Sequence, residues 1–457
     1  MGRFNCSKQR IRDFGFGLAL VLGGILGLVS PLTAATSPGG LGLRMELDRG
    51  VLPANSTQRA VVKITLDGPP PPRHTARPPV NLALVLDRSG SMAGSKLRKA
   101  QQAAIEALRR LNAQDVFGVV VYDHTIQTVV PAQQAVNQES IEGRIRAIRS
   151  GGNTALFGGV SQGAAEVRKY LQPGRIPRIV LLSDGIANVG PSSPADLERL
   201  GAALIKEGIS VTTVGVGTDY NEDLMARLAE ASDGNTYFVE SEHDLPRIFT
   251  AELGDVLSVV AQEINLTIQC PEGVRPLKVI GRKGRIRNGQ VEFSLNQIYG
   301  NQEKFALVEV EISGARPGET REIAAVRATY RNPFTRQHES ADERLMARFS
   351  TNRARVEESV NVEVKKDYYI NQQAIAQEKA IELFDQGLEK EAVEELRQSV
   401  DELKKAGKKY PSAPALMEAA EDLEEQADQI EAEGMTRKKR KILKTESYQI
   451  RNQQNAQ

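Results

Sequence analysis

An aspartate and two alternate serines follow a short apolar segment near the start of the chain. The stretch reads NLALVLDRSGSMAGSK, in which Asp87 ends the apolar run and Ser89 and Ser91 follow among glycines. A turn of this composition can direct one carboxylate and two hydroxyl oxygens at a single point. A set of oxygen ligands suits a hard divalent cation such as Mg²⁺ or Mn²⁺. The stretch therefore predicts part of a metal site.

Such a cation takes about six ligands, so other loops must supply further oxygens. Thr154 lies between glycines in SGGNTALFGG, and Asp184 follows the apolar run of IVLLSDGIANVG. In an open parallel sheet, ligands bind beyond the carboxyl ends of the strands. A turn or a helix cap explains one such residue, but it does not explain three loops together. We expect two carboxylates and three hydroxyls to converge, with one coordination position left open, and the ligands are Asp87, Ser89, Ser91, Thr154 and Asp184.

The elements that must position these side chains lie between residues 80 and 253. Short apolar runs alternate there with helical stretches, which is the pattern of a parallel sheet covered on both faces. This pattern predicts a doubly wound α/β domain. The expected strands are 82–87, 116–122, 178–184, 210–217 and 236–239, and the helices lie between them.

Two regions on either side of this domain read as strands with one solvated face. Apolar and polar residues alternate within 36–68 and again within 256–335. The first region holds only two strands, which form no stable sheet alone, and the second region can supply their partners. We expect the α/β domain to be inserted in, or flanked by, one β-sandwich.

The C-terminal part of the chain is highly charged and helical in pattern. Residues 360–433 predict a helical hairpin region, either similar to one tetratricopeptide-like hairpin or an ordinary amphipathic hairpin. Residues 434–457 are interpreted as a basic and polar tail. Its RKKRKILK segment could contact anionic lipid or an acidic protein, and its Gln- and Asn-rich end is predicted to be disordered.

A basic segment, an apolar run and small residues follow one another over residues 1–35. This order predicts a signal peptide that is cleaved near Ala34 or Ala35. We therefore expect a secreted or periplasmic protein. The alternative is an uncleaved signal that anchors the chain in a membrane.

The three segments DRSGSM, GGNTALFGG and LLSDGIANVG resemble the metal-ion-dependent adhesion site of von Willebrand factor A domains. The resemblance covers roughly residues 80 to 250 and implies a Rossmann-like fold. The whole chain is similar to bacterial exported proteins with such a domain and, more distantly, to inter-alpha-trypsin inhibitor heavy chains. The resemblance implies that the three hydroxyls contribute ligands, while Asp87 and Asp184 act directly or through water.

The function that follows is metal-dependent protein binding of the adhesion type. The open coordination position suits an Asp or Glu side chain of a protein partner. The expected cation is Mg²⁺, with Mn²⁺ and Ca²⁺ as alternatives. The other hypothesis is a structural scaffold that acts through its helical C-terminal region, in which the metal only stabilises the loops.

Other function classes fit the sequence less well. A phosphate loop requires Lys directly after its second Gly, whereas Ser95 precedes Lys96 here, and no G-x-S-x-G elbow surrounds Ser91. We therefore expect no enzyme. The net charge of +1 argues against nucleic-acid binding. Membrane contact is expected only through an uncleaved signal or the basic tail.

Overall fold

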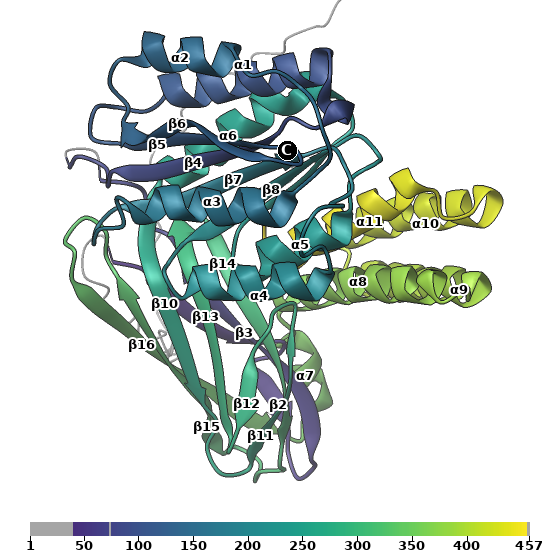
Figure 1. Cartoon of the computed structure of the whole chain (residues 1–457). Coiled ribbons are helices and arrows are strands. Elements are labelled where there is room, and N and C mark those ends of the chain that lie inside the picture. The colour runs from purple at the N-terminus through teal and green to yellow at the C-terminus, as the bar shows by residue number, and fades with distance from the viewer. Residues whose placement is uncertain (1–39, 73–74, 455–457) are drawn as a thin grey trace, which may run out of the picture. The chain divides into compact units, whose positions relative to one another are not determined.

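The computed structural model describes residues 40–72 and 75–454, and the predicted signal peptide lies outside them (Figure 1). Within this part of the chain, no helix is long and apolar enough to cross a membrane.

Six strands form the sheet of the α/β domain in the order β6-β5-β4-β7-β8-β9. All neighbours pair in parallel except β5 and β6. In Figure 1, α1, α2 and α6 cover one face of the sheet, and α3, α4 and α5 cover the other. The doubly wound prediction is therefore confirmed. The strands are β4 (Val80–Asp87), β5 (Val116–Tyr122), β6 (Ile126–Gln134), β7 (Ile176–Ser183), β8 (Ser210–Val216) and β9 (Thr236–Val239).

Every residue of β4 and β7 is buried, because helices pack on both faces of the sheet. Leu82, Leu84 and Leu86 of β4 face one core, and Ala83 and Val85 face the other. This explains why the two strands read as continuous apolar runs. The covering helices are α1 (Ser95–Arg109), α2 (Gln138–Arg146), α3 (Leu156–Arg168), α4 (Pro194–Ile205), α5 (Glu222–Ala231) and α6 (Leu245–Leu257).

The antiparallel edge strand β6 was not expected from the sequence. It contains Pro131, and several of its residues are exposed. Proline is tolerated in a strand at the edge of a sheet, where its missing N–H costs no ladder bond. A half-exposed strand with a proline gives a weak sequence signal, so it reads as a loop.

Two further sheets form the β-sandwich, with strand orders β1-β3-β14-β11 and β12-β13-β10-β15-β16-β2. The early strand β3 pairs antiparallel with β14, as in Val62 opposite Val308, so the expected shared sheet is present. One apolar core combines residues from both sheets. The strands are β1 (Gly42–Leu47), β2 (Val51–Pro53), β3 (Gln58–Asp67), β10 (Val259–Gln269), β11 (Val274–Ile280), β12 (Arg285–Arg287), β13 (Gln290–Tyr299), β14 (Glu303–Ile312), β15 (Thr320–Arg331) and β16 (His338–Ser350).

The strands continue past residue 335, where the sequence interpretation placed the end of the β-rich region. Strand β16 pairs with β15 and, in parallel, with β2. Its first half carries charged residues that are exposed or half-buried, and apolar residues are buried only toward its end. A charged edge segment of this kind lacks the alternation that identifies a strand.

Helices make up the C-terminal region, in which α8, α9 and α10 pack in succession and α11 returns against α8. In the residues predicted to be a basic and polar tail, the structure instead has the helix α11. Its basic residues find acidic partners on the α/β domain, for example Lys441 with Glu222 at 2.6 Å. The helices are α7 (Arg353–Glu358), α8 (Val362–Asp385), α9 (Glu389–Lys409), α10 (Ala415–Glu433) and α11 (Arg437–Asn452).

Candidate metal centre

The candidate ligands lie where the chain order of the parallel strands reverses. Strand β4 is the first strand of this sheet along the chain, and it lies between β5 and β7. The connections from β4 and β7 leave on opposite faces of the sheet, which opens a crevice at the carboxyl ends of these strands. Asp87 ends β4, and Asp184 directly follows β7. Fold topology therefore brings the two carboxylates to one edge.

Asp87 is fully buried and its carboxylate is held from two sides. Its Oδ1 accepts a hydrogen bond from the Ser89 backbone N–H at 2.8 Å, and its Oδ2 accepts one from the Ser183 hydroxyl at 2.8 Å. Burial raises the pKa of Asp87 to about 6, while these hydrogen bonds act in the opposite direction. A divalent cation at this position would favour the ionised carboxylate.

The serines of the first loop connect directly to the second carboxylate. Ser89 Oγ and Ser91 Oγ lie 3.0 Å apart, and the Ser91 hydroxyl donates to Asp184 Oδ1 at 2.7 Å. A short helix, η1 (Gly90–Met92), fixes the backbone between them. The Ser91 hydroxyl therefore joins the first loop to Asp184.

Thr154 is brought to the same place by the loop before α3. Its backbone N–H donates to Asn188 Oδ1 at 2.9 Å, and its C=O accepts from the Asn188 N–H at 3.1 Å. The Gly90 N–H donates to the C=O of Gly152 at 3.1 Å, which ties this loop to the first one. The structure thus brings all five sequence-predicted residues together.

Gly185 shows how closely the hydroxyls surround one point. A Cβ at this glycine would lie 3.1 Å from Thr154 Oγ1, 3.5 Å from Ser91 Oγ and 3.8 Å from Ser89 Oγ. The glycine leaves this space to three neutral oxygens and a nearby carboxylate. Among the described residues, no group of three or more His, Cys, Asp or Glu side chains is placed to hold a metal ion. The donor set fits a small hard cation.

Two residues of this cluster were not identified as site residues from the sequence. Lys96, in the first turn of α1, donates from Nζ to Asp184 Oδ2 at 2.6 Å. Ser183 holds Asp87, as described above. In the sequence, Lys96 stands out only as the lysine of an incomplete phosphate-loop pattern, although a lysine in the first turn of the helix after Ser91 can reach the end of the adjacent strand β7. Its ammonium group forms an ion pair with Asp184, one of the two carboxylates of the candidate site.

Replacing Gly152 by Ala is expected to weaken metal binding about tenfold. Gly152 has φ of +79°, and a Cβ there would lie 2.0 Å from His124 Nδ1. The strain of about 1–3 kcal/mol would be relieved by moving the loop that carries Thr154. Mn²⁺ titration followed by electron paramagnetic resonance measures the affinity.

Gly151→Ala is the matched control, because a Cβ at Gly151 would meet no atom within 4 Å. Its metal affinity should equal that of the unaltered chain. Equal affinities for both variants would show that the loop position does not matter for binding.

Comparison with known proteins agrees with this geometry. Residues 81–251 match the sequence model of the von Willebrand factor type A domain. The sll0103 protein of Synechocystis sp. is 27% identical over 274 residues, covering 58% of this chain and 64% of the relative. YfbK of Escherichia coli is 27% identical, and the match covers 46% of this chain and 37% of the relative. Human inter-alpha-trypsin inhibitor heavy chain H3 is 27% identical, covering 36% and 20%. The chain therefore spans less than two thirds of the length of each of these relatives.

Two solved structures share the fold over most of the chain. A von Willebrand factor type A protein from Catenulispora acidiphila has a TM-score of 0.65 at 18% identity, covering 80% of this chain and 87% of that chain. The ArnB paralog VWA2 from Sulfolobus acidocaldarius has a TM-score of 0.59 at 16% identity, covering 90% and 98%. At these identities the likeness concerns the fold alone. With the matched sequence model and the doubly wound sheet, it follows that residues 81–251 of this chain are a von Willebrand factor type A domain.

Proposed function

We propose that this protein is an exported binding module that holds a partner protein through a divalent cation. The observation that carries the proposal is the convergence of the Ser89, Ser91 and Thr154 hydroxyls around Gly185, beside Asp87 and Asp184. Domains of this type are in general metal-dependent protein-interaction modules. The proposed cation is Mg²⁺, and Mn²⁺ and Ca²⁺ are the alternatives to be compared.

The charges around the cluster favour an anionic ligand from the partner. Asp87 and Asp184 contribute two negative charges, and Lys96 compensates one of them through its contact with Asp184. A bound divalent cation would therefore keep a net positive charge, since the three hydroxyls are neutral. A carboxylate oxygen of an Asp or Glu on the partner would complete its coordination and neutralise this charge.

The proposal includes no catalytic step. Ser91 donates its hydroxyl to a carboxylate that is itself paired with Lys96, so both groups serve to arrange ligands. An extracytoplasmic location is part of the proposal, because it rests on the predicted signal peptide.

Capture of a partner should require both the cation and the Thr154 hydroxyl. Immobilised protein is incubated with the extracytoplasmic fraction of its source, with Mg²⁺, with chelator, and with Mg²⁺ restored after chelation. We expect a specific partner in the first and third conditions only. Thr154→Ala should lose it, whereas Thr154→Ser, which keeps a hydroxyl, should retain most of the binding.

A partner that binds equally with chelator and with Thr154→Ala would overturn this proposal. Deleting residues from 360 onward would then show whether the helical region binds it instead, as the scaffold hypothesis requires. A metal-dependent partner should remain bound to the truncated chain if that part stays folded, which circular dichroism checks.

A further inference from the structure

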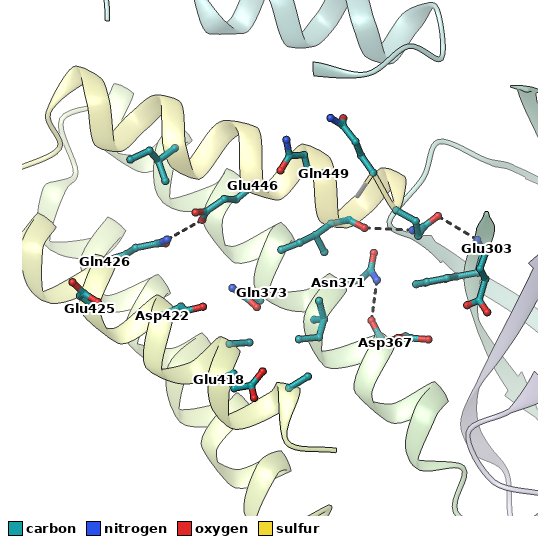
Figure 2. Close-up of a pocket in the computed structure, with 18 of the residues that line it drawn as sticks. Glu303, Asp367, Asn371, Gln373, Glu418, Asp422, Glu425, Gln426, Glu446 and Gln449 are labelled. Atoms are coloured by element: carbon teal, nitrogen blue, oxygen red, sulfur yellow. Dashed lines mark hydrogen bonds between the residues drawn. The ribbon is translucent and has the colours of Figure 1, made fainter. Parts of the chain in front are cut away.

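A cavity of about 1130 Å³ opens between α8, α10 and α11, beside the start of β14, and is called here the acidic cavity (Figure 2). Pockets for small ligands usually measure about 300–1,000 Å³, so this one is large. It lies outside the candidate metal centre and shares no residue with it. Its lining includes six carboxylates, from Glu303, Asp367, Glu418, Asp422, Glu425 and Glu446.

The negative charge of the acidic cavity is only partly balanced. Among the described residues that line it, none is Lys, Arg or His. Lys63 reaches in from β3 and pairs with Glu303 at 2.9 Å and with Asp367 at 2.6 Å. Three of the other carboxylates have no cationic partner within ion-pair distance among the described residues, and these are Glu418, Asp422 and Glu425.

Glu446 of α11 lies across the cavity from the carboxylates of α10 (Figure 2). It accepts hydrogen bonds from the side-chain amides of Gln426, at 2.8 Å, and Gln377, at 3.2 Å. Burial raises the pKa of Glu446, and the charge of Asp422 raises it further. The carboxylates of α10 and α11 therefore place negative charge in the same cavity.

Buried amide oxygens without a partner also line this cavity. Gln373 is 6% exposed and Asn371 is 1% exposed, and neither side-chain oxygen has a hydrogen-bond partner. The Asn371 nitrogen is fixed by its bond to the Asp367 C=O at 2.8 Å, and its oxygen is directed at Gly281, where an added Cβ would lie 2.4 Å away, so Gln373 is the unpartnered side chain that faces the cavity. Figure 2 shows Gln373 on α8 facing Asp422 on α10. A buried acceptor of this kind calls for a donor.

We propose that the acidic cavity binds an extended segment of a partner protein that carries Lys or Arg side chains. Carboxylates and free amide oxygens are acceptors only, whereas Lys and Arg are the positively charged side chains that only donate. Their charge complements the unbalanced carboxylates, and their N–H groups can donate to the carboxylate oxygens that line the cavity. This site is independent of the metal centre and of its partner.

The spacing of the carboxylates indicates an extended segment. Glu418, Asp422 and Glu425 lie on one face of α10, because residues four and three apart are neighbours on a helix. Four helical residues rise about 6 Å. Two residues of an extended chain advance about 6.6 Å, so basic side chains at alternate positions would meet successive carboxylates.

The test uses the full chain, with chelator present, and a labelled acetyl-Lys-Ser-Lys-Ser-Lys peptide whose binding is followed by fluorescence anisotropy. We expect saturable binding that weakens with added salt. The pair Glu418→Gln and Asp422→Asn should lower the affinity about tenfold, since each partly exposed ion pair contributes up to about 1 kcal/mol. A peptide with Gln in place of Lys should not bind.

The matched control combines Glu421→Gln on α10 with Asp401→Asn on α9, both exposed and outside the cavity lining. It changes the net charge equally and should leave the affinity unaltered. An equal loss in the control would mean non-specific attraction and would overturn the proposal, as would no binding of the lysine peptide at all. Spermidine that binds as tightly as the peptide, with the same variant dependence, would overturn the extended segment as occupant.

Discussion

The affinity for Mg²⁺ is expected to fall about 100-fold in Asp87→Asn, the upper end of the loss seen when groups around a metal are changed. The variant removes one of the two carboxylate charges at the end of β4 and keeps an oxygen that can accept from the Ser89 N–H. Calorimetric titration with Mg²⁺, supported by Mn²⁺ paramagnetic resonance, measures the loss. The unaltered chain should also gain thermal stability with Mg²⁺, and the variant should gain little.

Asparagine is preferred to alanine here because Asp87 is fully buried. Alanine would leave the Ser89 N–H and the Ser183 hydroxyl without their acceptor, at a cost of about 1–3 kcal/mol for each buried group. A loss of metal binding in Asp87→Ala could then come either from misfolding or from the missing ligand, and the two causes could not be separated.

Asp219→Asn provides the control for charge. Asp219 lies in the exposed loop after β8, where it pairs with Arg437 at 3.3 Å and does not touch the hydroxyl cluster. Its affinity for Mg²⁺ should be unchanged. If Asp87→Asn bound Mg²⁺ as tightly as this control, the assignment of Asp87 to the metal site would be wrong.

Replacing Glu222 by Ala is expected to destabilise the chain by about 3 kcal/mol, because it removes the acceptor of two cations. Glu222 at the start of α5 accepts from Arg440 at 2.5 Å and from Lys441 at 2.6 Å. Lys441 is 2% exposed, and its Nζ lies 4.7 Å from the centre of the Tyr220 ring. Without Glu222 this buried ammonium group loses its carboxylate, and α11 should separate from α5.

Urea unfolding measures the change in the free energy of unfolding, and trypsin reports the release of α11 through cleavage at its lysines and arginines. Glu240→Ala is the control, since Glu240 pairs with Lys438 of the same helix while its side chain is 64% exposed. It should unfold and resist trypsin like the unaltered chain. A Glu222→Ala protein that does the same would show that this contact does not hold α11.

The sequence by itself determined five of the six strands of the central sheet, and it located the candidate ligands. Strands buried on both faces must be apolar throughout, and a parallel sheet places the residues that follow its strands at one edge. These two constraints are local or topological, so Asp87, Thr154 and Asp184 could be located from their positions after apolar runs or between glycines. The resemblance of three motifs in order then added the roles of the serine hydroxyls.

Only the tertiary structure decided which charges meet. The charges that meet come from residues distant in sequence. Examples are the pairs Lys96 with Asp184 and Lys441 with Glu222, and the carboxylates that line the acidic cavity. The basic run at 437–444 looks the same in a solvated tail as in a docked helix, and an edge strand such as β6 looks like a loop. The sequence pattern does not reveal which charged side chains will pair. The energy of an ion pair depends on the distance between the two charges and on their burial, and both are set only in the folded chain.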